Sequence, residues 1–291
     1  MREVVDDLGR AVRVPQQPGR LVSLVPNLTE TLWWWHLADR VVGLTDHCVA
    51  PPRAFPGATR VRGTKNPDLA AIERLEPDLV VANEEENRRL DVERLAEAGV
   101  AVYVTRVRTV PDAAEALARL GDAVGRADAG AGSRQAVLRG LDQVRPAAPA
   151  VTMVCPIWRD GRGQEDRWWL VGSDTFAGDL LARCGFAQAV EATRGARYPP
   201  VASEMVAAAA PSAVLLPDEP YAFGRDDAEV AAGWDARVRH LDGTAVSWWG
   251  PRTPHALGDL ARLARQLARP RRRSRPWSPG AASAGAGHRG G

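Results

Sequence analysis

The side chains best suited to hydrogen-bond a ligand come directly after short apolar runs of the sequence. One such run, Leu79 to Ala82, is followed at once by the polar stretch Asn83 to Asn87. An apolar run of this kind is typical of a strand buried on both faces, and open α/β sheets bind ligands at the loops that follow their strands. The first half of the sequence therefore predicts a ligand-binding edge, with candidate residues Asn27, His47, Lys65, Asn66, Asn83 and Glu84.

Aromatic side chains take the corresponding places in the second half of the sequence. The candidates, which lie in or beside loops expected to follow strands, are Trp158, Tyr221, Trp248 and Trp249. Aromatic faces opposite hydrogen-bonding groups suit a large, planar, partly polar ligand. Burial in the core is the alternative for every tryptophan, and we expect about two or three of the ten to reach a ligand.

His47 and Cys48 are residue types that ligate metals or act in nucleophilic catalysis. Without a second cluster this pair is weak evidence for a metal site, and no metal is predicted. The three cysteines of the chain have no CxxC spacing, which argues against a disulfide framework and a structural zinc site. A cytosolic hydrolase or transferase that uses the His47/Cys48 loop stays open as an alternative function, although the sequence contains no GxSxG, P-loop or HExxH motif.

The ligand-binding edge needs a sheet to position it, and residues 1–110 alternate between strand and helix patterns. Strands are predicted at 21–25, 41–44, 79–82 and 101–104, after a small hairpin at 4–14. The intervening helices include one that begins near Thr29, capped by Thr29 or Asn27, and one from about Pro67, capped by Asn66 or Asp68. Such alternation implies a parallel sheet covered by helices.

Residues 111–145 lack a strand pattern, and their apolar residues recur at helical spacing. We predict one long connecting helix there, with the glycines from Gly125 to Gly132 as the place where it could be interrupted. Residues 146–269 repeat the alternation, with a polar loop at 155–166, a helix capped by Ser203 and strands at 151–154, 168–171, 213–216 and 245–246. The predicted fold is α/β, with two lobes of mainly parallel sheets covered by helices, one long backbone helix between them, and a ligand cleft between the lobes.

Composition and charge set further bounds on function. The chain has 291 residues, 45% of them apolar, and a net charge of +2. Residues 270–291 are rich in Arg, Pro, Gly and Ala and predict a disordered basic tail. Because that tail carries five arginines and no acid, the remainder has a net charge of −3, and no nucleic-acid partner is expected.

The N-terminal sequence MREVVDDLGRAVRV lacks the apolar segment of a secretory signal, and no apolar run is long enough to span a membrane. As written, the sequence predicts a cytoplasmic protein. A start codon assigned too late in the gene would instead make the protein extracytoplasmic. We expect a monomer that needs no cofactor.

Seven segments carry a family resemblance over about residues 4–268: RLVSLVPNLTETL, DRVVGLTDHCVAPP, GTKNPDL, LEPDLVVANEEENRRLDVERL, AVYVT, VGSDTFAGDLLARCGF and YPPVASEMV. As a set and in this order, they resemble the helical-backbone class of ABC-transporter substrate-binding proteins. The likeness is strongest to cobalamin-binding and iron-siderophore or haem-binding receptors. The resemblance implies a non-enzymatic protein that binds a corrinoid or a ferric chelate between two lobes. Lys65 and Asn66 are expected to hydrogen-bond this ligand, Trp248 to stack on it, and His47 to contact its metal side.

The resemblance also implies a permease partner. In such receptors each lobe offers an acidic residue to basic pockets on an ABC permease. Glu204, in VASEM, matches the second-lobe position, whereas Ala70 occupies the first-lobe position. Asp68 or Glu73 lies within about one helical turn and is the expected substitute. This departure, together with the missing signal, leaves open a ligand-binding relative that is uncoupled from transport.

Overall fold

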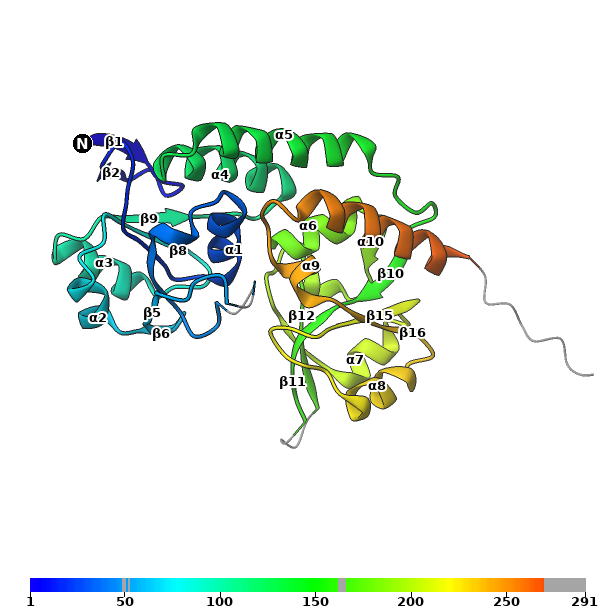
Figure 1. Cartoon of the computed structure of the whole chain (residues 1–291). Coiled ribbons are helices and arrows are strands. Elements are labelled where there is room, and N and C mark those ends of the chain that lie inside the picture. The colour runs from blue at the N-terminus through cyan, green and yellow to red at the C-terminus, as the bar shows by residue number, and fades with distance from the viewer. Residues whose placement is uncertain (49–50, 52, 162–165, 270–291) are drawn as a thin grey trace, which may run out of the picture.

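The computed structural model describes residues 1–48, 51, 53–161 and 166–269. Figure 1 shows two lobes side by side, with a pair of helices lying across one end of both. The predicted basic tail at 270–291 lies outside the described residues. Within them, no helix combines the length and the apolar character needed to cross a bilayer.

The first lobe is built on a five-stranded parallel sheet with the strand order β5-β4-β3-β8-β9. Its strands are β3 (Leu21–Ser23), β4 (Val41–Leu44), β5 (Thr59–Arg60), β8 (Leu79–Asn83) and β9 (Val102–Thr105). All five residues of β8 are buried, as expected for a strand covered on both faces. The parallel sheet that the sequence predicts for this lobe is confirmed.

Three helices, a 3-10 turn and two short antiparallel strand pairs complete the lobe. The helices are α1 (Pro26–Trp34), α2 (Leu69–Arg74) and α3 (Arg89–Glu97), and the turn is η1 (Ala38–Arg40). The pairs are β1 (Arg2–Val5) with β2 (Ala11–Val14) and β6 (Arg62–Gly63) with β7 (Asn66–Pro67). Asp68 caps α2, because its side chain accepts a hydrogen bond of 3.0 Å from the amide of Ala71. The expected cap of α1 is wrong. That helix begins at Pro26, and the Thr29 hydroxyl is buried and donates to Ser23 and to the Val25 carbonyl.

The connection between the lobes differs from the single helix that the sequence predicts. It consists of two helices, α4 (Val110–Ala123) and α5 (Ala127–Gln143), which pack against each other. Gly125 has a φ of +73° and ends α4 in the left-handed region that glycine adopts without strain. Two further glycines, Gly121 and Gly130, face each other at the crossing, where a Cβ on Gly130 would lie 2.9 Å from the Cα of Gly121.

Helix α5 contacts both lobes. Near its middle, the Ser133 hydroxyl accepts a hydrogen bond of 2.9 Å from the indole nitrogen of Trp35, at the end of α1 in the first lobe. Towards its end, Gly140 lies against Pro254 of α10 (Thr253–Ala268) in the second lobe. The predicted helical link is therefore present, but it is the second arm of a helical hairpin.

The second lobe contains a four-stranded parallel sheet with the order β13-β10-β15-β16 and a three-stranded antiparallel sheet with the order β11-β12-β14. The strands are β10 (Val151–Val154), β11 (Pro156–Asp160), β12 (Arg167–Leu170), β13 (Phe186–Gln188), β14 (Pro200–Ala202), β15 (Ala213–Pro217) and β16 (Arg237–Leu241). Around them lie α6 (Phe176–Arg183), η2 (Glu191–Thr193), α7 (Ser203–Ala208), α8 (Arg225–Ala232), α9 (Gly243–Ser247) and α10.

Three expectations for the second lobe are wrong. The polar loop predicted at 155–166 contains strand β11, which pairs with β12. The strand predicted at 245–246 is helix α9, capped by Asp242, whose side chain accepts from the amide of Thr244. Ser203 is the first residue of α7 and not its cap, because its hydroxyl donates to Asp166 instead.

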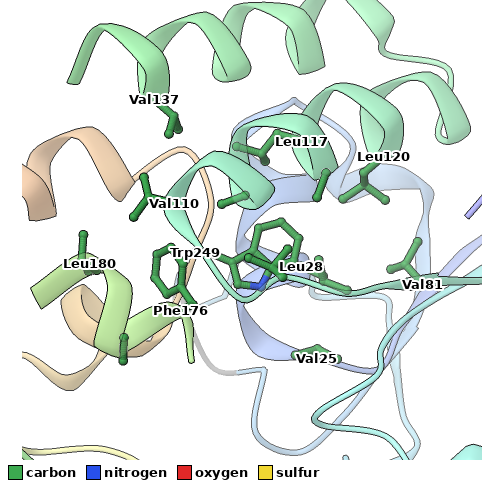
Figure 2. Packing of buried hydrophobic residues seen from close by; sticks show 14 of the residues in the cluster. Val25, Leu28, Val81, Val110, Leu117, Leu120, Val137, Phe176, Leu180 and Trp249 are labelled. Carbon is green, nitrogen blue, oxygen red and sulfur yellow. The ribbon is translucent and has the colours of Figure 1, made fainter. Parts of the chain in front are cut away.

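The two lobes share one hydrophobic core. A single cluster of buried side chains includes Leu28 of α1, Val110 of α4, Phe176 of α6 and Trp249, which follows α9. Figure 2 shows these residues from both lobes gathered under the helical hairpin. The lobes are therefore joined by packing at the hairpin end of their boundary.

Candidate ligand site between the lobes

The loop that follows β8 is built around two asparagines. The side-chain oxygen of Asn83 accepts from the amides of Glu85 and Glu86 at 2.9 and 3.3 Å, and the Asn83 amide donates to the side chain of Asn87 at 2.9 Å. The Asn83 side-chain nitrogen donates to Thr105. These bonds hold the backbone of the acidic loop in a defined turn, with Glu84 exposed and Glu85 and Glu86 partly buried.

The two preceding loops of the first lobe converge on this acidic loop. Lys65 lies in the β6-β7 turn and donates from Nζ to the carbonyl of Glu85. The amide of Asp46 donates to the Arg62 carbonyl at 2.8 Å, which holds the loop after β4 beside the same turn. His47, in that loop, is exposed and faces Gly63, and Asn66 is exposed in β7. The structure thus brings His47, Lys65, Asn66 and Glu84 to one edge, as the sequence predicts.

The acidic loop meets the second lobe. Glu84 accepts from Arg108 at 3.0 Å and lies 3.9 Å from the Arg197 guanidinium, which belongs to the second lobe. Tyr198, in the second lobe, lies near Glu85, and burial together with the charge of that carboxylate raises the pKa of Tyr198 above its ordinary value. The loops of the first lobe therefore face the second lobe.

Glu86, in the same acidic loop, is half-buried. Burial raises the pKa of Glu86, the nearby Lys65 lowers it, and the carboxylates of Glu85 and Glu219 raise it. Glu219 lies in the loop after β15, in the second lobe, where it accepts from the indole of Trp248 at 2.9 Å and from the Ser247 hydroxyl at 2.7 Å. Charge carried by the second lobe therefore acts on the Glu86 carboxyl of the first.

The candidate aromatic residues have different environments. Trp158 of β11 is 50% exposed, and its ring lies 5.0 Å from that of Tyr221, the geometry of an edge-to-face pair. Trp248 is 8% exposed and lies under the guanidinium of Arg252, 5.4 Å from the ring centroid. Trp249 is buried in the shared core. Only Trp158 and Tyr221 among these four present accessible faces in this conformation.

Two further contacts between the lobes lie next to the shared core. Asn27, at the start of α1, is buried and donates from its side chain to the Trp249 carbonyl at 2.9 Å. Glu30, one turn further along α1, forms a two-pronged ion pair with Arg252 of the second lobe. Asn27, Asn83 and Trp249 therefore have structural partners, which favours a role in shaping the site over direct contact with a ligand.

The sequence did not predict four residues at the lobe boundary as site residues: Arg108, Arg197, Tyr198 and Glu219. Tyr198 and Arg197 lie in or beside the YPPV motif, which the resemblance contained, and that motif was the available signal. No sequence signal pointed to Glu219, because its influence on Glu86 depends on how the lobes are set relative to each other.

Cys48 is poorly placed for nucleophilic catalysis. It is 2% exposed, and its sulfur is hydrogen-bonded to the Thr29 and Thr45 hydroxyls. Burial raises the pKa of the Cys48 thiol, and it raises the pKa of Cys155 and Cys184 to about 12. A buried thiol that stays protonated is a weak nucleophile, which argues against an enzyme built on the His47/Cys48 loop. In the described part of the chain, no three His, Cys, Asp or Glu side chains gather as a metal site requires.

Comparison with known proteins agrees with this architecture. A cobalamin-binding protein of Halobacterium salinarum is 26% identical over 215 residues, which cover 72% of this chain and 57% of that protein. A vitamin B12-binding protein of Vibrio cholerae is 27% identical over 96 residues, which cover 33% of this chain and 34% of that protein. The chain thus spans little more than half the length of the first of these relatives and about a third of the second.

Two solved structures share the fold. The periplasmic heme-binding protein RhuT from Roseiflexus sp. RS-1 superposes with a TM-score of 0.73 at 21% identity, over 86% of this chain and 99% of that one. The periplasmic vitamin B12-binding protein BtuF of Vibrio cholerae gives a TM-score of 0.69 at 18% identity, over 86% and 98% of the two chains. A family model described as Periplasmic binding protein matches residues 21–230, well over half of the sequence. The chain therefore belongs to the periplasmic binding protein family.

Proposed function

We propose that this chain is the substrate-binding component of an ABC-type uptake system and carries a corrinoid or an iron chelate between its lobes. The observation that carries the proposal is the meeting of loops from the carboxyl ends of both parallel sheets at the lobe boundary. Relatives named for cobalamin, vitamin B12 and heme support the ligand class.

A ligand reaches this site when the facing loops separate. Contacts that hold them together here include the 3.9 Å approaches of Glu84 to Arg197 and of Arg108 to Asp174, and the interaction of Glu85 with Tyr198. Because both Glu84 and Arg197 are partly exposed, their ion pair is worth at most about 1 kcal/mol. The shared core and the helical hairpin hold the other end of the boundary, so opening is a small rotation about that end.

In this proposal, the accessible candidates contact the ligand directly. Lys65 and Asn66 hydrogen-bond its polar groups, His47 faces its metal side, and Trp158 with Tyr221 offers an aromatic edge. Trp248 stacks on the ligand only if Arg252 moves from its ring. Glu84 exchanges its pairing with Arg197 for a ligand contact when the lobes open.

Docking to a permease uses the end of the molecule opposite the helical hairpin. Glu204 is exposed on the first turn of α7, and Glu73 is exposed on α2. Figure 1 shows both helices on the side away from α4 and α5. Asp68 is less available because it caps α2 and lies 3.7 Å from Arg62. Glu204 and Glu73 are thus our preferred docking pair, Asp68 the second choice, and an uptake role places the protein outside the cytoplasmic membrane.

Titration calorimetry with cyanocobalamin, a ferric siderophore and ferric haem tests the proposed function. At least one of these is expected to bind with a Kd of about 1 μM or tighter, since about −8 kcal/mol is a moderate affinity for ligands of this size. Quenching of tryptophan fluorescence should accompany binding, because in this proposal the half-exposed ring of Trp158 contacts the ligand. Absence of heat and of quenching with all three ligands would contradict the proposal.

A further inference from the structure

The end of the second lobe that lies away from the ligand loops is rich in arginine. Arg265 of α10 donates to the carbonyl of Arg145, which follows α5, and Arg237, the first residue of β16, donates to the carbonyl of Arg269 at 3.1 Å. These bonds bring together the ends of α5 and α10, which Figure 1 shows on the same side of the second lobe, and the start of β16. We call this surface the basic end, and its arginines are Arg145, Arg237, Arg239, Arg262, Arg265 and Arg269.

Positive charge is concentrated in the basic end and in the segment attached to it. Segments 142–145, 235–239 and 259–269 contain six arginines and three aspartates, and residues 270–291 add five arginines and no acid. These parts of the sequence therefore carry a net charge of +8 in a chain whose total is only +2, which leaves −6 for all the other residues. Such a separation of charge is typical of a protein that binds an anionic surface with one face.

Capping of helix ends accounts for only part of this charge. Arg145 donates to the carbonyls of Asp142 and Val144 at 3.0 Å, and Arg265 donates to the Arg145 carbonyl. A helix C-terminus carries about half a negative charge, so the ends of α5 and α10 need only about one cation between them. Because a carbonyl acceptor does not cancel the formal charge of a guanidinium, the basic end keeps a positive surplus.

A hollow between α5 and α10 adds a place where an anion can be held. Its volume is about 230 Å³, and Gln143, Arg145 and Arg265, all exposed, are among the residues that line it. That volume has room for a phosphate group, since a water molecule occupies about 30 Å³ of liquid. Guanidinium and amide N–H groups are donors that suit phosphate oxygens. The hollow therefore offers short-range contacts within a surface whose other arginines attract anions from further away.

We propose that the basic end and residues 270–291 together bind the surface of a membrane that contains anionic phospholipids, with a headgroup phosphate held in the hollow. The sequence RRRSRPW at 271–277 places four arginines beside Trp277. Clustered arginines are attracted to anionic lipids, and tryptophan favours the membrane–water interface. This combination favours a lipid surface over duplex nucleic acid, which presents the same phosphate chemistry.

This inference goes beyond the proposed function and does not depend on it. The surface is separate from α2 and α7, which are the helices proposed to dock on a permease. Binding through the basic end would therefore hold the protein at a membrane between docking events. Attraction between exposed charges is screened by salt, which keeps such an association reversible.

Co-sedimentation of the full chain with lipid vesicles tests the inference. Vesicles of phosphatidylcholine that contain about one third phosphatidylglycerol are expected to bind the protein at least about a hundredfold more tightly than pure phosphatidylcholine, because each arginine near the surface contributes about 1 kcal/mol. Raising the salt from about 0.05 M to about 0.5 M should abolish most of this preference. Equal binding to both kinds of vesicle would overturn the inference.

Substitutions in the folded end separate its contribution from that of residues 270–291. Arg145→Gln and Arg265→Gln should each weaken binding about fivefold, the factor that corresponds to about 1 kcal/mol. Arg265→Lys keeps the charge and should bind within about twofold of the unaltered protein, even though its bond to the carbonyl is changed. Arg89→Gln is the matched control, since Arg89 is exposed on α3 of the first lobe, and it should leave binding unchanged.

Three results would contradict the proposal. Loss of binding on replacing Arg271, Arg272 and Arg273 with glutamine, without any effect of Arg145→Gln and Arg265→Gln, would show that the folded end takes no part. An equal effect of Arg89→Gln would show attraction to net charge alone. Tighter binding of a duplex oligonucleotide than of the anionic vesicles at the same salt would identify nucleic acid as the partner. None of these results bears on whether a ligand binds between the lobes, so the proposed function stands or falls separately.

Discussion

Replacing Arg252 with alanine is expected to lower the free energy of unfolding by about 3 kcal/mol, the low end of the range for breaking a buried ion pair. The guanidinium of Arg252 pairs with Glu30, whose side chain is only 10% exposed, so the variant leaves a carboxylate buried without a counter-charge. The contact of Arg252 with the Trp248 ring is lost as well. Urea denaturation followed by tryptophan fluorescence measures the effect.

Two further variants separate the ion pair from side-chain loss in general. Arg225→Ala is the control, because Arg225 pairs with Glu229 on an exposed face of α8, where both side chains are more than half exposed. This control should cost less than about 0.5 kcal/mol. Adding Glu30→Gln to Arg252→Ala should recover part of the lost stability, since the unpaired charge is removed. Equal losses for Arg252→Ala and Arg225→Ala would contradict the role given to the Glu30–Arg252 pair.

Replacing Gly130 with alanine is expected to lower the free energy of unfolding by about 2–3 kcal/mol through overpacking. The added Cβ would lie 2.7 Å from the Leu117 carbonyl oxygen and 2.9 Å from the Cα of Gly121. Both neighbours are backbone atoms of α4, so relief requires the two helices to move apart. The same denaturation experiment measures the loss.

The matched control is the same substitution two residues further along α5. A Cβ on Gly132 would have no atom within 4 Å, so Gly132→Ala introduces no clash. It should raise stability by about 0.5–1 kcal/mol, because alanine favours the helix over glycine. If Gly130→Ala proved as stabilising as Gly132→Ala, the close packing of α4 on α5 would be the wrong account of the connection.

The sequence predicts the first lobe well because its signals are local. The run from Leu79 to Asn83 is buried over its whole length, and the loop after it is polar, so the strand and the edge at its end follow from neighbouring residues. The same holds for β4 and the loop that carries His47. The approach of these loops to one another requires only that the strands be parallel, which the alternation of helices and strands implies.

The connection between the lobes shows where such reasoning fails. Helical spacing over residues 111–145 is real, and both α4 and α5 are helices. Whether the glycine-containing segment kinks one helix or reverses the chain depends on what packs against it. Here the close approach of Gly121 and Gly130 favours a hairpin, and this tertiary contact lies outside the range of a periodicity argument.

Errors in the second lobe have a similar cause. The segment Ala245–Val246 is short and apolar, and its helical state depends on the cap provided by Asp242 and on burial of Val246. The edge position of the sheet is filled by β16, whose sequence RVRHL is too polar to signal a buried strand. The sequence thus predicts the sheet of the second lobe but assigns its last strand to the wrong residues.

The candidate site was predictable in part for the same reason. Lys65, Asn66 and His47 reach the site from the turn and loop that follow strands. Asn83 instead turns inward to bonds within its own lobe, and Asn27 and Trp249 turn inward to a contact between the lobes. The effect of Glu219 on Glu86 likewise depends on how the two lobes are set relative to each other, because these residues lie more than a hundred positions apart in the sequence.

Hydrogen–deuterium exchange with and without saturating cyanocobalamin tests most directly whether a ligand binds between the lobes. Protection is expected in both lobes at once, in the loops at 45–48, 64–66 and 83–87 of the first and at 217–223 of the second, with little change in α3. Such a pattern requires a ligand that contacts both walls. Protection confined to one lobe, or spread over helices away from the boundary, would contradict the account.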